Sequence, residues 1–290
     1  MSTVQQVIAE QAAQDIADTS KVKSLSLQII AEMNLLIPNV LVSAEDLNVA
    51  VSASVNLFLQ PAAKEALRRA IRARGGAVLS INSAYRTVAQ QHMLRTFYER
   101  GTSGISLAAK PGLSNHEDGL ALDISVKTPD NPNQDANFVA WRAALEAEGW
   151  DWLGIQDPFH FTYAGTGVRD DIGDIGVTAF QKLWNKQNPS DQITTDGLFG
   201  PQTAVRMDQS PAEGFKTTRL LKLVTPNLQG EDVRKVQQAL VNAGFLNANP
   251  VSGTYDTATE IAVKNFQDQK GLGKDGIVGP QTRKALGITV

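Results

Sequence analysis

Two short segments carry the side chains best suited to bind and activate a reacting group. The chain has three histidines, and two of them lie near carboxylates. His116 precedes Asp123 on one segment, and Asp157 precedes His160 on the other. Asp123 is the one charged residue of the apolar segment LALDISV, residues 120–126. Burying a carboxylate there costs free energy unless a cation or hydrogen-bond donors compensate for it.

A metal ion would supply that compensation. His116, Asp123 and His160 together offer nitrogen and oxygen ligands and leave a fourth position open, which is the pattern of a catalytic zinc site. Asp157 would then accept a proton from the attacking water and pass it to the leaving amine. The chain has no cysteine, which excludes disulfides, thiolate metal sites and a cysteine nucleophile. Each histidine alone could be a hydrogen-bonded core residue, and His92, inside an expected helix, is interpreted as structural.

The segments around these residues predict a mixture of helices and strands. Apolar spacing together with proline and glycine at the ends predicts helices over 4–17, 61–73, 88–101 and 138–150. Strands are expected over 77–85, 120–126 and 159–163, and a loop over 102–115. The sequence therefore predicts an α+β fold with a small mixed or antiparallel sheet flanked by helices.

The C-terminal third contains an internal repeat. Phe180-Gln181 and DGLFGPQT (196–203) recur as Phe266-Gln267 and DGIVGPQT (275–282). The first copy has a longer spacing, so it is interpreted as degenerate, with an insertion and without a preceding helix. Apolar spacing after residue 229 predicts a small all-α module of three helices.

These features predict four parts, and a chain of 290 residues is long enough for two domains. Residues 1–44 form an N-terminal helical segment. Residues 45–213 form the catalytic domain, including the degenerate repeat at 174–213. Residues 214–228 form a linker, and residues 229–290 form the three-helix module.

The first constellation resembles a known family. Residues 114–123 match the SxHxxGxAxD signature of the zinc D-alanyl-D-alanine carboxypeptidases, which include the VanY enzymes and vancomycin-resistance dipeptidases, through Ser114, His116, Gly119, Ala121 and Asp123. The resemblance implies a zinc metallopeptidase with Zn2+ as its cofactor, held by His116, Asp123 and His160.

The second signature of that family, Glu-x-Trp-His, is altered in this chain. It reads Asp157, Pro158, Phe159 and His160, so an aspartate stands at the position of the catalytic glutamate. Relatives that cleave L-alanyl-D-glutamate bonds also carry aspartate there. The expected activity is a D-alanyl-D-alanine carboxypeptidase. The alternatives are an L-alanyl-D-glutamate endopeptidase of the endolysin type and a non-catalytic wall-binding protein whose metal is structural.

Further site residues follow from the resemblance. The segment SAYRT, residues 83–87, is similar to the family's Ser-Gly-Tyr-Arg segment. Arg86 is therefore expected to stabilise the oxyanion of the tetrahedral intermediate, with Tyr85 near the substrate. Ser114 could bind a substrate terminus or cap its loop. Trp152 could line the pocket or pack in the core.

The segments LQGEDVRKVQQAL, FQ and DGIVGPQT resemble a three-helix peptidoglycan-binding domain. This second resemblance implies peptidoglycan as the partner. With 27 Lys plus Arg against 30 Asp plus Glu and a net charge of -3, nucleic acid is not an expected partner. We expect a monomer without membrane insertion, because polar residues interrupt the apolar stretch 25–42. The site of action is expected at the cell wall, although the first 20 residues lack the features of a secretory signal. Release in the manner of a phage lysin would be one export route.

Overall fold

The computed structural model describes residues 1–105, 107–215, 220–248 and 250–288. Contacts divide the chain into two units, Met1–Glu213 and Gly214–Val290, and each is described by itself. Within the expected linker, residues 216–219 lie outside the described residues. The same holds for residues 249, 289 and 290 of the expected C-terminal module.

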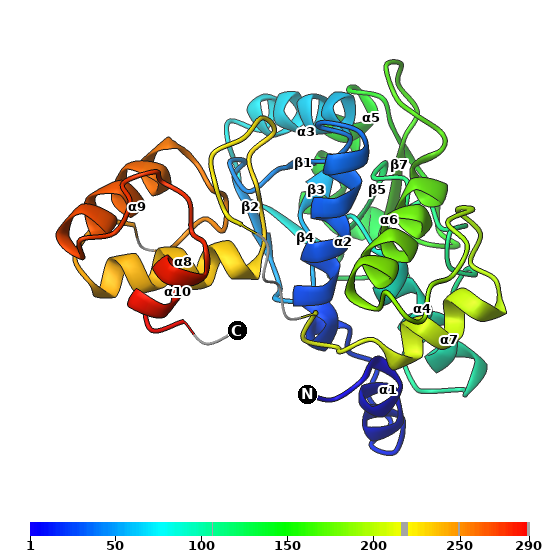
Figure 1. The fold of residues 1–290 in the computed structure, drawn as a ribbon. Coiled ribbons are helices and arrows are strands. Elements are labelled where there is room, and N and C mark those ends of the chain that lie inside the picture. The colour runs from blue at the N-terminus through cyan, green and yellow to red at the C-terminus, as the bar shows by residue number, and fades with distance from the viewer. Residues whose placement is uncertain (106, 216–219, 249, 289–290) are drawn as a thin grey trace. The chain divides into compact units, whose positions relative to one another are not determined.

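The first unit is built on a mixed five-stranded sheet with the order β2-β4-β5-β7-β6 (Figure 1). The strands are β2 (Val49–Val51), β4 (Leu79–Ser83), β5 (Ala121–Ile124), β6 (Trp150–Trp152) and β7 (His160–Tyr163). β2 pairs with β4 in parallel, and the remaining pairs are antiparallel. A separate antiparallel pair joins β1 (Val42–Ser43) to β3 (Phe58–Leu59). The expected α+β class and mixed sheet are confirmed.

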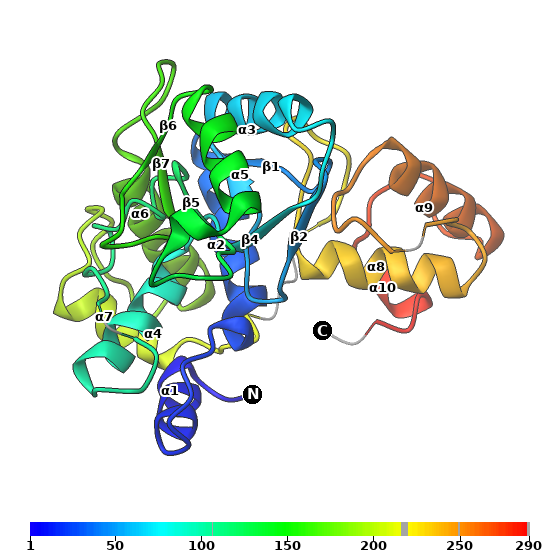
Figure 2. The same cartoon turned by 180° about the vertical axis from the view of Figure 1, so that it is seen from behind.

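Helices cover both faces of this sheet. The helices of the first unit are α1 (Val4–Ala12), α2 (Lys23–Leu36), α3 (Pro61–Ala73), α4 (Val88–Glu99), α5 (Ala136–Glu146), α6 (Ile172–Gln187) and α7 (Pro201–Gln209). α2 and α6 pack on each other and lie in front of the strands in Figure 1. From behind, α5 lies in front of the strands instead (Figure 2). The sheet is therefore sandwiched between helical layers.

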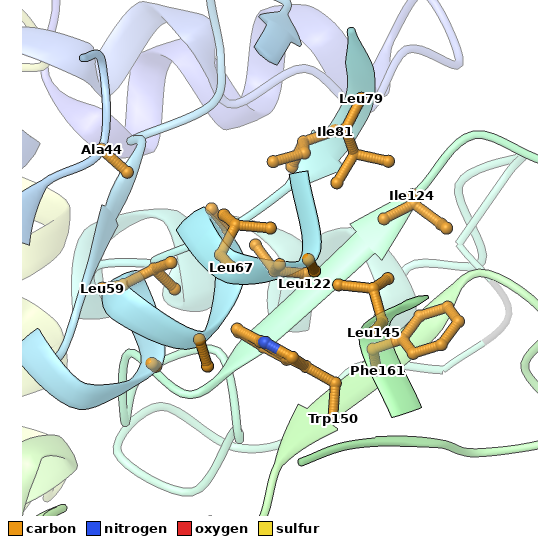
Figure 3. Close-up of a cluster of buried hydrophobic side chains, with 14 of the residues drawn as sticks. Ala44, Leu59, Leu67, Leu79, Ile81, Leu122, Ile124, Leu145, Trp150 and Phe161 are labelled. Atoms are coloured by element: carbon orange, nitrogen blue, oxygen red, sulfur yellow. The ribbon is translucent and has the colours of Figure 1, made fainter. Parts of the chain in front are cut away.

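The alternation of side chains along β5 and β7 separates the core from the functional face. Leu122 and Phe161 are completely buried and pack with Leu67 of α3 and Leu145 of α5 in one hydrophobic cluster (Figure 3). Because successive side chains of a strand point to opposite faces, Asp123 is turned away from this cluster. Burial of Leu122 and Phe161 in the core thus determines which residues of β5 and β7 lie on the opposite face of the sheet.

Local signals fix the ends of the helices next to the site. α3 begins at Pro61, where the missing N–H costs no helical hydrogen bond. Thr87 and Gln90 form a capping box at the start of α4, in which each side chain bonds the other's backbone N–H. This cap holds the chain directly after Arg86.

Residues 1–44 pack within the first unit. The backbone N–H of Val4 donates to the carbonyl of Ser210 at 2.9 Å, and α1 contacts α7. The expected helix over 4–17 is too long, because it ends at Ala12 and Asp15 has a left-handed backbone with φ of 54°. His92 of α4 hydrogen-bonds Asp208 of α7 at 2.8 Å, which joins these helices as well.

The second unit contains α8 (Glu231–Asn242), α9 (Thr257–Gln269) and α10 (Pro280–Ala285). Val233, Leu240, Tyr255, Val263 and Phe266 belong to its hydrophobic core. Expected from the apolar spacing, this all-α character is confirmed. Among the described helices of both units, none combines the length and apolar character needed to cross a membrane.

One buried glutamine organises each of three helix-turn-helix segments. Gln267 of α9 bonds Asp275, the carbonyl of Ile277 and Thr282, and accepts from the N–H of Gly276. Gln181 of α6 makes the matching bonds to residues 196–203. Gln237 of α8 does the same with residues 252–259. This copy, residues 237–259, was not predicted from the sequence.

The copy centred on Gln237 lies between the other two in the sequence, and its spacing can be compared with theirs. The glutamine and the threonine it bonds are 22 positions apart in both the first and the middle copy, but 15 in the last. The first copy is therefore seven positions longer than the last, 22 against 15, as the sequence spacing predicts, and it is as long as the middle copy. Its helix α6, which carries Gln181, corresponds to α9, which carries Gln267.

Candidate metal centre

Two adjacent strands and one loop bring His116, Asp123 and His160 together. Asp123 of β5 lies directly opposite His160 of β7 in the antiparallel register. His116 comes from the loop that precedes β5. One ligand atom from each residue lies within 4.8 Å of the others. The three residues expected to bind a metal thus form one cluster.

Gly119 lets the His116 loop turn tightly into β5. Its φ is +67°, a left-handed backbone that glycine adopts without strain. A Cβ atom at this position would lie 2.6 Å from Cδ2 of Leu41 and 3.3 Å from the backbone nitrogen of Gln60. That backbone nitrogen also donates to the carbonyl of Gly119 at 3.0 Å. A side chain at residue 119 would therefore displace the loop.

A backbone carbonyl orients the imidazole of His116. Its Nδ1 lies 2.8 Å from the carbonyl oxygen of Ala84. Because a carbonyl oxygen only accepts hydrogen bonds, Nδ1 carries the proton. In the neutral ring, Nε2 then presents its lone pair to Oδ2 of Asp123, which is 3.3 Å away. His160 approaches the other carboxylate oxygen, with 3.0 Å between its Nδ1 and Oδ1.

The electrostatics of this cluster favour a cation. Burial is the main cause that lowers the pKa of His116, and Arg86 lowers it further. Burial alone would raise the pKa of Asp123, but its contacts with His116 and His160 and the charge of Arg86 outweigh burial and lower the pKa. A neutral imidazole lone pair and an ionised carboxylate therefore face each other, and a metal ion between them relieves the repulsion. The donor set fits zinc.

Arg86 is held beside the cluster by several acceptors. Its Nη2 lies 3.3 Å from Oδ2 of Asp123 and donates to Ser83 Oγ at 3.1 Å, and its Nη1 donates to Gln91 at 3.3 Å. Burial is the main cause that lowers its pKa, while the charges of Asp123, Glu117 and Asp157 act in the opposite direction. Arg86 is thus a fixed cation at the metal cluster.

Asp157 lies in the loop between β6 and β7 and is half-buried. The backbone N–H of His160 donates to the carbonyl of Asp157 at 3.1 Å, so a tight turn links the two residues. Asp157 also lies close enough to Arg86 to affect its pKa. Its expected role in proton transfer stays a prediction.

The three expected substrate contacts have different surroundings. The hydroxyl of Tyr85 donates to Sδ of Met33 at 3.0 Å, and only 2% of Tyr85 is exposed, so its burial does not support a substrate contact. Ser114 Oγ accepts from the N–H of His116 at 3.4 Å, which is a loop-capping contact. Trp152 donates from its indole nitrogen to the carbonyl of Pro158 at 3.1 Å and holds the loop of Asp157.

Glu117 is a site-shaping residue that the sequence reasoning missed. Its carboxylate accepts from the N–H groups of Gly112, at 2.9 Å, and Ser114, at 3.2 Å. Burial raises its pKa to about 8, although these backbone bonds oppose the shift. Its place between the signature residues His116 and Gly119 was the signal that could have identified Glu117 from the sequence. Ser83 and Thr162, each near a signature residue in sequence, were also missed.

Two parts of the chain match known family profiles. Residues 56–153 match D-alanyl-D-alanine carboxypeptidase (VanY). Residues 229–286 match a putative peptidoglycan binding domain. The first match includes Arg86, His116 and Asp123 but ends before Asp157 and His160. The assignment of Asp157 and His160 to the site therefore rests on the sequence motif and, for His160, on the sheet register.

Curated relatives of this chain include two N-acetylmuramoyl-L-alanine amidases and a spore cortex-lytic enzyme. A probable N-acetylmuramoyl-L-alanine amidase of Bacillus licheniformis is 34% identical over 139 residues, 43% of this chain and 38% of the relative. The N-acetylmuramoyl-L-alanine amidase CwlL of the same organism is 35% identical over 103 residues, 33% of this chain and 28% of the relative. The spore cortex-lytic enzyme of Bacillus subtilis (strain 168) is 43% identical over 58 residues, 20% of this chain and 19% of the relative. The chain thus spans less than two fifths of each relative.

Proposed function

Because the chain combines a VanY domain with a C-terminal peptidoglycan-binding domain, we propose that it is a zinc-dependent peptidase of peptidoglycan stem peptides. The preferred reaction is removal of the terminal D-alanine, a D-alanyl-D-alanine carboxypeptidase activity. The observation that carries the proposal is the cluster of the buried His116 and His160 with the half-buried Asp123, whose ligand atoms lie within 4.8 Å of one another. The protein acts at the cell wall.

The side chains divide the chemistry among them. When bound, zinc supplies Lewis acidity to the scissile carbonyl and to the attacking water. Asp157 accepts a proton from that water and donates it to the nitrogen of the leaving amino acid. The guanidinium of Arg86, fixed by Ser83 and Gln91, stabilises the negative charge on the carbonyl oxygen. Binding of the C-terminal unit to the wall raises the effective substrate concentration.

The aspartate at residue 157 supports an alternative scissile bond in the substrate. Since relatives that cleave L-alanyl-D-glutamate bonds also have aspartate at this position, an endopeptidase of the endolysin type is the second candidate. A non-catalytic wall-binding protein is the third, and in it the metal would stabilise only the fold.

Mass spectrometry of digests separates the three candidates. Purified peptidoglycan and a defined pentapeptide are incubated with zinc-loaded protein, with and without a chelator, and His160→Ala serves as the control variant. Loss of one terminal alanine, abolished by the chelator, is the expected result. Cleavage between L-Ala and D-Glu would replace the carboxypeptidase with the endopeptidase. No cleavage by a protein that contains stoichiometric zinc would favour the wall-binding protein.

A further inference from the structure

Thr162 is the hydrogen-bond partner of the outer nitrogen of His160. Both residues belong to β7, two positions apart and therefore on the same face of the strand. Thr162 Oγ1 lies 3.0 Å from Nε2 of His160, and Asp123 Oδ1 lies 3.0 Å from Nδ1. His160 is therefore held at both ring nitrogens.

The two histidines of the cluster are held by different kinds of group. The Ala84 carbonyl at Nδ1 of His116 can only accept, so it permits one neutral tautomer. The hydroxyl of Thr162 can donate or accept. It can therefore pair with Nε2 of His160 whether or not that nitrogen carries the proton.

This difference matters because Nδ1 of His160 faces the carboxylate. Without a metal, a proton on Nδ1 is stabilised by Asp123, and the Thr162 hydroxyl donates to Nε2. A metal at Nδ1 requires its lone pair, so the proton must then be on Nε2, where Thr162 can accept it. The proton lost from Nδ1 is matched by the proton gained at Nε2 through solvent, and the ring stays neutral.

We infer that Thr162 is a positioning residue that stabilises the metal-binding tautomer of His160 by accepting from its Nε2–H. The inference rests on the proposed zinc site. Partners of this kind fix ring orientation, and their loss typically lowers metal affinity by about 10- to 100-fold. The residue opposite Thr162 on β5 is Ala121, whose methyl group cannot replace the hydroxyl.

Full-length Thr162→Val and Thr162→Ser test the inference. Valine keeps the shape and removes the hydrogen bond, whereas serine keeps the hydroxyl. Zinc affinity is measured by competition with a chromophoric chelator, and the tautomer of His160 by 15N NMR of the metal-free and zinc-bound proteins. We expect Thr162→Val to lose about 10- to 100-fold in zinc affinity and Thr162→Ser to stay near wild type. Bound zinc should move the His160 proton from Nδ1 to Nε2.

The outcomes separate this inference from the proposed function. An unchanged zinc affinity in Thr162→Val overturns the role of Thr162, and so does an equal loss in both variants, which would indicate packing by the methyl group. Zinc coordination through Nε2 of His160 also overturns it. If wild-type protein takes up no zinc while metal-free spectra still show the His160 pairing, the proposed function fails instead. Thermal melting of the metal-free variants controls for folding.

Discussion

Replacing Gln267 by methionine should unfold the C-terminal unit while leaving the first unit intact. Methionine has a similar size, so the change removes hydrogen bonds without a large cavity. Asp275 and the carbonyl of Ile277 each keep another partner. The N–H of buried Gly276, which donates to Gln267 at 2.9 Å, loses its acceptor.

The size of the effect follows from these bonds. An orphaned buried donor costs about 1–3 kcal/mol, and each further lost bond about 0.5–1.5 kcal/mol. With one orphaned donor and three further bonds, the total free energy of unfolding lost is about 2.5–7.5 kcal/mol. A hydrophobic core of this size rarely supplies more than about 3–5 kcal/mol. The variant should therefore populate the unfolded state of this unit at room temperature.

The four tryptophans make the assay specific, because Trp141, Trp150, Trp152 and Trp184 all lie in the first unit. In a urea titration of Gln267→Met, the transition seen by tryptophan fluorescence should occur at the same urea concentration as in the wild-type protein. The helical signal in far-ultraviolet circular dichroism should be lost at a lower urea concentration. Sedimentation with peptidoglycan should fail for Gln267→Met and succeed for the exposed control Gln269→Met. If the circular dichroism transition of Gln267→Met coincided with that of the wild-type protein, the organising role of the buried glutamine would be refuted.

The remaining predictions concern the catalytic unit. Asp157→Asn should keep stoichiometric zinc by metal analysis but lose about 10²- to 10⁴-fold in kcat; substantial turnover would remove it as the proton carrier. Arg86→Gln should lower kcat by about 10²- to 10³-fold, measured on a pentapeptide, and an effect confined to KM would contradict oxyanion stabilisation. For Glu117, the folded pKa of about 8 exceeds the usual value of 4.5, so its stabilising contribution is complete below pH 4.5 and is lost as pH rises through 8. The gap in unfolding free energy between metal-free wild type and Glu117→Gln should therefore shift by up to about 5 kcal/mol across this range. If denaturant titrations gave the same gap in unfolding free energy at every pH, the raised pKa of Glu117 would be contradicted.

Sequence reasoning succeeded where residue type and spacing carry the physical constraint. Pro61 and the glycine pair at 75–76 gave both ends of α3. Asp123 in an apolar strand indicated a cation, and its register partner His160 came from the second signature. These signals are local, so a single sequence contains them.

Other features depend on contacts that one sequence does not reveal. β1, β2 and β3 contain two or three residues each, too few for a strand period. β6 (Trp150–Trp152) was missed because the expected helix over 138–150 included Trp150 and because Trp152 was interpreted only as a pocket or core residue. The third glutamine-centred turn shares little with the others beyond Gly253 and Thr259, so its likeness is visible only in the hydrogen bonds.

The contact between the two ends of the first unit has a consequence for biosynthesis. Val4 bonds Ser210, and the N–H of Ala212 donates to the carbonyl of Ser2 at 3.0 Å. During synthesis α1 is made before α4 and α7, which it contacts, and its pairing with residues 210–212 has to wait until the rest of the unit has been made. Closing so long a segment costs conformational entropy that increases only slowly with length. During this interval the apolar face of α1 lacks part of its cover, and its bonds to Ser210 can form only when the unit is complete.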